Sequence, residues 1–308
     1  KSSVGERVAD FILPDTSGRK VALSDFSEKR ALVLYFTGTG CPISNLYLAE
    51  LAEMQRRYEK DGVQIIGINS NAGVTTDDLR SHAAEFKVAF PSLLDAEQRV
   101  ADRLGAARTA EVFLLDARHV VRYHGRVDDR FGYTYKNATA ARYDLDEAIR
   151  ELLAGKEISV PETKALGCLI TRARPSREEA AVTYAKDVSR ILARRCAECH
   201  RPGMIGPFSL LSYDDAAGHA DMLKEVVLQG RMPPWHADPR FGDWSNSRQM
   251  PQQEIDALVS WVDSGAPFGD ENDLPAAEKY AEGWTIGQPE LVFELPEEVT
   301  VQAEGVVH

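Results

Sequence analysis

The sequence predicts an α/β domain followed by a small all-α domain and a C-terminal tail with strand character. A continuous apolar run at residues 31–36 and a largely apolar segment at 63–68 each precede a segment of helical periodicity. Such runs are typical of strands that a sheet buries on both faces. The second half carries three amphipathic helical patterns around the sequence Cys-Ala-Glu-Cys-His at residues 196–200. The chain has 308 residues, which is enough for two domains of ordinary size.

The first half alternates predicted strands and helices. We predict short extended pieces at residues 8–11 and 21–26, strands at 31–36, 63–68 and 90–94, helices at 45–60, 76–86 and 97–104, paired strands at 112–115 and 120–123, and a closing helix at 145–153. Strand–helix alternation that ends in a hairpin and a helix indicates an α/β sandwich.

Composition shifts divide the chain into four segments. Residues 1–160 are the α/β domain, residues 161–180 a charged linker, residues 181–275 the all-α domain, and residues 276–308 an extended tail. In the all-α segment we predict helices at residues 181–195, 212–228 and 252–264.

The motif at residues 196–200 has the Cys-x-x-Cys-His spacing of a covalent c-type haem site. On a helix, Cys196 and Cys199 lie one turn apart on one face, so each thiol can add to a vinyl group of the same porphyrin. His200 can then place an imidazole nitrogen on the iron. We predict one covalent haem c, and the alternative is half of a zinc site, which would need two further soft ligands.

A second axial ligand is predicted downstream, in the sequence Arg-Met-Pro-Pro-Trp at residues 231–235. A thioether suits ferrous iron, which favours Met232 as the second iron ligand. Trp235 can pack on the porphyrin. The alternatives for the sixth position are His236, His219, Met204 and an open site.

Residues 4–155 resemble the thioredoxin-like redoxin family of AhpC/TSA type. The resemblance rests on Leu-Tyr-Phe at residues 34–36 leading into Gly-Cys-Pro-Ile-Ser at 40–44, and on Thr-Ala-Glu-Val-Phe-Leu-Leu-Asp at 109–116. The family places a reactive cysteine at the strand-to-helix turn, which implies Cys41. Here Ser44 stands where the second cysteine of a Cys-x-x-Cys pair is usual, and Ala110 stands where the family has a cis proline. The peroxiredoxin pattern upstream of the cysteine is not met either.

Two further cysteines bear on this chemistry. At a helix N-terminus the peptide dipoles stabilise a thiolate, so Cys41 is either redox-active or a vestige of such a site. Cys168 can fold back as a distant resolving partner in a disulfide, or both can be separate thiols. Arg126 and Arg130 either add positive charge near Cys41 or form local ion pairs.

The second half resembles a small single-haem cytochrome c over residues 181–270. The whole is similar to redoxin–cytochrome modules of multidomain bacterial proteins. The tail resembles the lead-in to a copper-dependent monooxygenase domain that follows such modules, although no copper-binding histidine cluster occurs before His308. The tail is therefore expected to dock on a partner or to be a truncated connection.

Charge and composition narrow the function further. The net charge of −12 argues against a nucleic-acid partner. No apolar run reaches the ~20 residues that span a bilayer. A c-type haem is attached outside the cytoplasm, so we expect a periplasmic or extracytoplasmic protein whose signal peptide has been removed.

The sequence thus predicts an electron-transfer protein with one haem c and a redoxin domain that exchanges thiols and disulfides through Cys41. Its expected partners are redox proteins, including a larger membrane-associated complex reached through the tail. The alternatives are a redox-inert adaptor that docks the cytochrome in a respiratory or oxidase complex, and a fragment of a copper monooxygenase fusion.

Overall fold

The computed structural model describes residues 3–132, 136–172, 181–235, 237, 242, 244–276, 278, 280 and 290–293. The chain falls into two compact units, Lys1–Pro275 and Ala276–His308. All helices and strands of the described residues belong to the first unit. The predicted α/β and all-α segments therefore lie in one compact unit.

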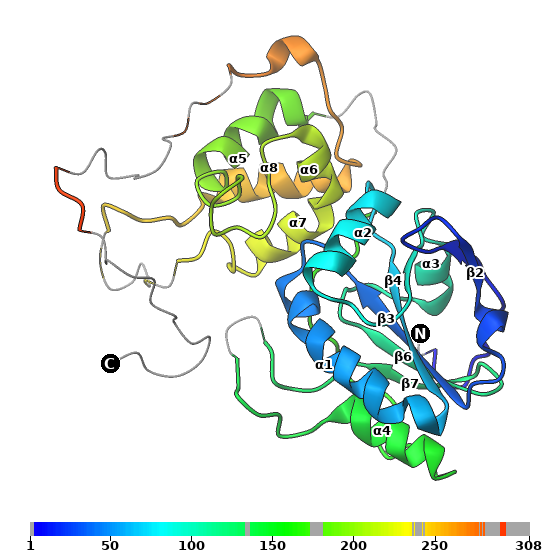
Figure 1. The fold of residues 1–308 in the computed structure, drawn as a ribbon. Helices are drawn as coiled ribbons and strands as arrows, with labels where there is room; N and C mark the ends of the chain where they lie inside the picture. Colours follow the sequence, from blue (N-terminus) through cyan, green and yellow to red (C-terminus); the bar gives the residue numbers. More distant parts are fainter. Residues whose placement is uncertain are drawn as a thin grey trace. The chain divides into compact units, whose positions relative to one another are not determined.

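A five-stranded sheet in the order β5-β4-β3-β6-β7 forms the centre of the first half (Figure 1). Its strands are β3 (Ala31–Thr37), β4 (Val63–Asn69), β5 (Ser92–Leu94), β6 (Val112–Asp116) and β7 (Val121–Gly125). β3, β4 and β5 run parallel, and β6 is antiparallel to β3 and β7. The two predicted apolar runs are confirmed as the neighbouring strands β3 and β4, and the predicted hairpin as β6 and β7.

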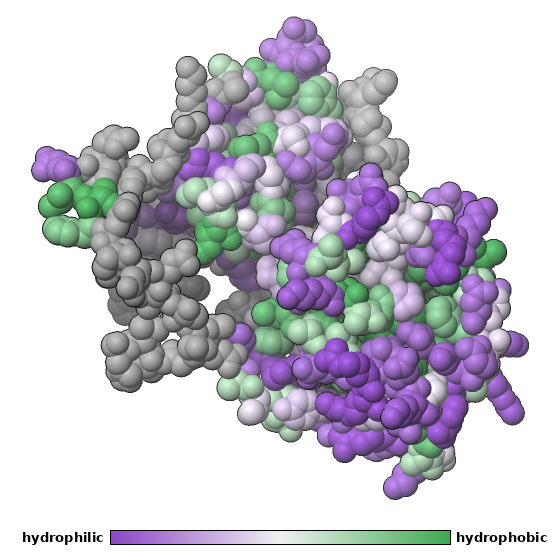
Figure 2. Space-filling model, viewed as in Figure 1, coloured by the Kyte–Doolittle hydropathy of each residue, from purple (hydrophilic) through white to green (hydrophobic). Residues whose placement is uncertain are grey.

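Each face of the sheet has its own apolar core, because successive residues of a strand point to opposite sides. Ala31, Val33 and Tyr35 of β3 pack with α1 and α4, whereas the alternate residues pack with α3 and a small hairpin. The other elements of this half are β1 (Ile12–Pro14), β2 (Lys20–Ala22), η1 (Leu23–Phe26), α1 (Pro42–Tyr58), η2 (Glu59–Asp61), α2 (Thr76–Glu85), α3 (Arg99–Leu104) and α4 (Asp144–Leu153). Figure 2 shows hydrophilic residues gathered over α1 and α4, which is the solvent side of that layer.

The second half is a group of helices around Trp261, whose ring is fully buried and whose Nε1 donates to the Pro267 carbonyl at 3.0 Å. The helices are η3 (Tyr184–Val188, a π-helical turn), α5 (Ser189–Arg195), α6 (Tyr213–Gly218), α7 (Ala220–Leu228), α8 (Gln252–Asp263) and η5 (Glu271–Asp273). The prediction of one helix over residues 212–228 is wrong, because His219 interrupts the helix and separates α6 from α7. The ring of His219 stacks on Phe208, with centroids 3.9 Å apart.

The segment expected to be a linker packs on the α/β half as far as Arg172. Glu162 forms a parallel bridge with His124 of β7, and Leu169 forms an antiparallel bridge with Arg108. We call residues 161–172 the strap. Residues 173–180, which contain Pro175, lie outside the described residues.

The predicted strands of the tail, including the last residues up to His308, lie almost wholly outside the described residues. Residues 290–293, which are described, contain no strand. Within the described part of the chain, every helix is too short or too polar to cross a membrane.

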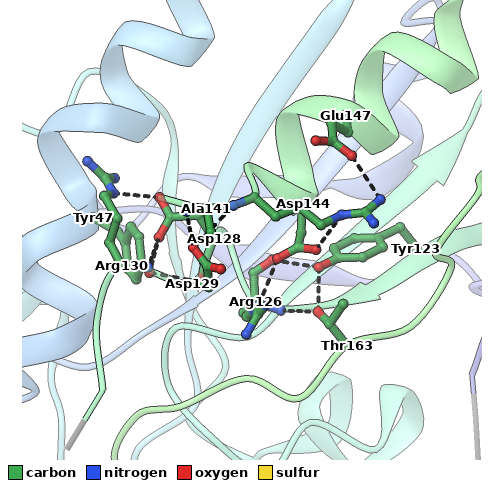
Figure 3. Close-up of polar contacts among 11 residues, drawn as sticks. Tyr47, Tyr123, Arg126, Asp128, Asp129, Arg130, Ala141, Asp144, Glu147 and Thr163 are labelled. Carbon is green, nitrogen blue, oxygen red and sulfur yellow. Dashed lines mark hydrogen bonds and ion pairs between the residues drawn. The ribbon is translucent and has the colours of Figure 1, made fainter. Parts of the chain in front are cut away.

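A buried ion cluster joins the turn after β7 to the start of α4 (Figure 3). Asp144 is 3% exposed and pairs with Nε of Arg126 at 2.7 Å and Nε of Arg142 at 3.0 Å. Asp128 pairs with Nε of Arg130 at 2.7 Å and accepts a hydrogen bond from the Tyr47 hydroxyl. Arg126 and Arg130 therefore form local ion pairs, the second of the two alternatives that the sequence left open.

Replacing Asp144 tests this cluster. We expect Asp144→Ala to lower the free energy of unfolding by about 3–5 kcal/mol, because it leaves two partly buried guanidinium groups without their carboxylate. Urea unfolding followed by circular dichroism measures the change. Glu147→Gln is the control, since Glu147 is more exposed and its loss should cost less than about 1 kcal/mol. Equal losses in the two variants would contradict this assignment.

Candidate functional site

Cys41 lies where the sequence places it, at the turn between β3 and α1. It is the N-cap residue of α1, with φ −95° and ψ 111°, and Pro42 follows at the first helical position. Its sulfur accepts from the Ser44 amide at 3.5 Å. This amide would otherwise be one of the unpaired donors at the helix start. The side chain of Cys41 is only 2% exposed.

The strap brings Cys168 to Cys41 across 127 residues of sequence. The Cys168 amide donates to Cys41 Sγ at 3.4 Å, and the Cys168 carbonyl accepts from the Thr109 amide at 2.8 Å. Gly167 permits this close approach, because a Cβ there would lie 2.0 Å from the Thr109 carbonyl oxygen. Both cysteines are free thiols in this structure. The two cysteines that the sequence could not connect therefore share one site.

The surroundings shift the two thiols in opposite directions. A hydrogen bond from the Cys168 side chain lowers the pKa of Cys41, and the Thr109 hydroxyl and the amides of Ser44 and Cys168 act in the same direction against the cost of burial. The same interaction with Cys41, together with burial, raises the pKa of Cys168. Cys41 is therefore the more easily deprotonated thiol of the two.

Two substituted positions of the redoxin pattern have structural roles here. The Ser44 hydroxyl accepts from the Gly38 amide at 3.3 Å and from the Tyr35 hydroxyl at 3.2 Å, which holds the turn around Cys41. Ala110 has a φ of +64°, a left-handed conformation that is uncommon for a residue with a Cβ, and its amide donates to the Phe36 carbonyl. Sequence reasoning missed Thr109, although it begins the second of the two quoted motifs.

The Cys-x-x-Cys-His motif follows α5 in a helical turn. The amides of Cys199 and His200 both donate to the Cys196 carbonyl, at 3.1 and 2.9 Å. The His200 Nδ1 lies 3.1 Å from the Phe208 carbonyl, which can only accept, so this nitrogen carries the proton. Burial lowers the pKa of His200, which favours the neutral ring. Nε2 is therefore left as the nitrogen that can bind a metal. The hydrogen bond from Nδ1 to the Phe208 carbonyl fixes the orientation of the ring.

The other predicted haem residues are less closely joined to His200. Met232 follows α7 and is 41% exposed, and Trp235 is half-buried. Of the alternative ligands, Met204 is exposed, His219 is half-buried and stacks on Phe208, and His236 lies outside the described residues. Within the described residues, no hydrogen bond or ring contact connects Met232 to His200. The sixth ligand stays a prediction.

Comparison with known families agrees with the geometry around Cys41. Residues 4–124 match the family model described as the AhpC/TSA family. These residues form an AhpC/TSA-type redoxin domain. The thiol-disulfide oxidoreductase ResA of Geobacillus thermodenitrificans is 30% identical over 114 residues, which are 37% of this chain and 64% of that protein. ResA of Bacillus subtilis is 27% identical, also over 114 residues. The chain thus spans less than two thirds of the length of these relatives.

Two solved structures are similar to more than half of this chain. A hypothetical protein from Sinorhizobium meliloti is 33% identical, with a TM-score of 0.51, over 55% of this chain and 94% of its own. An uncharacterized conserved protein from Geobacillus kaustophilus is 26% identical, with a TM-score of 0.52, over 56% and 94%. These comparisons support the thioredoxin-like fold of the first half.

The thiolate of Cys41 should depend on the donor that Cys168 provides. We expect the pKa of Cys41 to lie below the ordinary thiol value of 9.0, to rise in Cys168→Ala, and to stay lower in Cys168→Ser, whose hydroxyl can still donate. As the pH falls through this lowered pKa, the thiolate is protonated and its reactivity is lost. Titration of ¹³Cβ-labelled cysteine by NMR measures the value without requiring solvent access. An unchanged pKa in Cys168→Ala would refute the pairing.

Gly167 should be intolerant of a side chain. Because the added Cβ of Gly167→Ala meets the Thr109 carbonyl, the strap has to shift, and we expect a loss of about 1–3 kcal/mol in unfolding free energy with a rise in the pKa of Cys41. Urea unfolding and the same NMR titration measure both effects. Gly218→Ala is the matched control, because its Cβ would meet no atom within 4 Å. A Gly167→Ala variant that behaves like this control would contradict the described approach of the strap.

Proposed function

We propose that this chain is an extracytoplasmic thiol-disulfide redox protein whose Cys41–Cys168 dithiol works beside a covalent haem c. The single observation that carries the thiol half is the contact between the two cysteines, with the Cys168 amide on Cys41 Sγ at 3.4 Å. The similarity to ResA proteins, which are named thiol-disulfide oxidoreductases, supports this choice.

The dithiol exchanges two electrons with a disulfide in two displacement steps. The Cys41 thiolate attacks one sulfur of the substrate disulfide, forms a mixed disulfide and releases the other sulfur as a thiolate, which takes up a proton. Cys168 then loses its proton and attacks Cys41 Sγ, which forms the Cys41–Cys168 disulfide and releases the second substrate thiolate. The substrate is reduced to two thiols, and the protein dithiol is oxidised to one disulfide.

One contact in the second half supports the proposal of a haem c. The Phe208 carbonyl accepts from Nδ1 of His200, which orients the ring and leaves Nε2 able to bind iron. Cys196 and Cys199 would form the thioethers, His200 and Met232 would bind the iron, and Trp235 would pack on the porphyrin. A bound haem c supplies one-electron exchange at its iron. Restoring two thiols from the disulfide takes two electrons and two protons, so a one-electron donor has to act twice.

A redox-inert adaptor is the second candidate, and one observation favours it. Cys41 is almost fully buried, and a buried thiol of a structural kind is inert. In this alternative the haem alone conducts electrons, and the redoxin domain holds the cytochrome in a larger complex of redox partners.

Intact mass with alkylation of the denatured chain separates these functions. The protein is isolated under oxidising conditions and labelled with iodoacetamide before and after mild reduction. We expect one haem mass, no label on Cys196 or Cys199, and label on Cys41 and Cys168 only after reduction. Cys168→Ser is the control, and its Cys41 should take label without reduction.

Each half of the proposal can fail separately in this experiment. Label on both Cys41 and Cys168 without reduction would favour the adaptor. A chain without haem mass, with Cys196 and Cys199 labelled, would remove the electron-transfer half and leave the dithiol.

A further inference from the structure

We propose that Glu225 determines the substrate size of the Cys41–Cys168 dithiol, by holding the helical half closed over it. This inference deepens the proposed function and rests on it for the identity of the reaction. The substrates that fit are small disulfides, and folded protein disulfides are excluded.

Glu225 of α7 joins the two halves through ion pairs with Arg108 and Arg231, and we call these three residues the clamp. One carboxylate oxygen pairs with Nη2 of Arg108 in the redoxin half, and the other pairs with Nη2 of Arg231, which directly precedes Met232. Arg108 also donates through Nη1 to the Gly167 carbonyl at 2.9 Å, next to Cys168 in the strap. All three charged side chains are mostly shielded from solvent. The clamp therefore fastens α7 to the part of the strap that carries Cys168.

The helical half also packs against Cys168 and approaches the residue that precedes Cys41. Cys168 and Leu169 pack against the helical core that contains Trp261. On the other side, a Cβ on Gly40 would lie 3.7 Å from the Pro207 carbonyl oxygen and from Phe208 Cβ. The residue that precedes Cys41 is thus in contact range of the loop before α6. Cys41 itself is only 2% exposed.

This closure limits which disulfides Cys41 can attack. Displacement requires the attacking sulfur, the attacked sulfur and the leaving sulfur to lie in a line, so the substrate must approach Cys41 directly. A folded protein cannot bring a disulfide to a thiol buried between two packed halves, whereas a small disulfide needs only a local opening. Without Glu225, Arg108 and Arg231 lose the carboxylate that joins them and repel each other, which favours the open form.

Size-graded labelling of the reduced, folded full-length protein tests this inference. Cys41 is reacted with N-ethylmaleimide or with a maleimide on a protein-sized polyethylene glycol, and its modification is followed by peptide mass. In the wild type we expect the large reagent to react at least about tenfold more slowly than the small one. In Glu225→Gln we expect the large reagent to gain about tenfold, because a buried charge pair at the interface is lost. Asp263→Asn is the matched control, since it removes an ion pair of the neighbouring Lys224 without touching the strap, and its rates should match the wild type.

Arg108→Gln provides a second variant that breaks the clamp from the redoxin side, and circular dichroism confirms that each variant is folded. Equal rates for both reagents in the wild type would overturn the inference. Rates unchanged from the wild type in both folded clamp variants would also overturn it. These rates do not require a disulfide to form, so failure of the proposed thiol exchange would show in the alkylation experiment on oxidised protein and not here.

Discussion

The site depends on the pairing of the strap with the chain before β6. Leu169 bridges to Arg108, and the Thr109 amide donates to the Cys168 carbonyl, so the strap runs as a short added strand. This backbone pairing, rather than the cysteine side chains, sets the position of Cys168. Main-chain hydrogen bonds fix register within a fraction of a residue, and they leave the Cys168 amide pointing at Cys41 Sγ. The same pairing places the Cys168 side chain, whose hydrogen bond is the largest cause that lowers the pKa of Cys41.

The strap also supplies a second cysteine to a redoxin half that lacks a Cys-x-x-Cys pair at Cys41. In such a pair the second thiol lies one helical turn after the first, at the position that Ser44 occupies here. Ser44 instead accepts hydrogen bonds from Tyr35 and Gly38 and stiffens the turn. The Cys41 sulfur accepts from the nearby Ser44 amide and from the Cys168 amide of a distant segment. Cys41 thus lies at a helix N-terminus, while the position of the second cysteine depends on tertiary structure.

Elements with a single dominant physical cause could be predicted from the sequence. β3 is a continuous apolar run and β4 a largely apolar one, because both faces of each strand are buried. The break at His219 was missed because the apolar period continues through it, although Gly218 just before it weakens a helix. The strap was predicted to be a linker because it contains proline, glycine and charged residues, which are also frequent in flexible linkers. For the same reason the contact between Cys41 and Cys168 stayed open.

Phe208 relates the two predicted chemistries within one compact unit. Its Cβ would lie 3.7 Å from a Cβ placed on Gly40, so Phe208 is next to the residue that precedes Cys41. Its ring stacks on His219, and its carbonyl accepts from His200 Nδ1. A displacement of this loop would therefore alter the cover of Cys41 and the orientation of His200 together. Separate domains joined by a flexible linker would not share such a residue. The loop that contains Phe208 thus contacts both the residue before Cys41 and the candidate haem ligand His200.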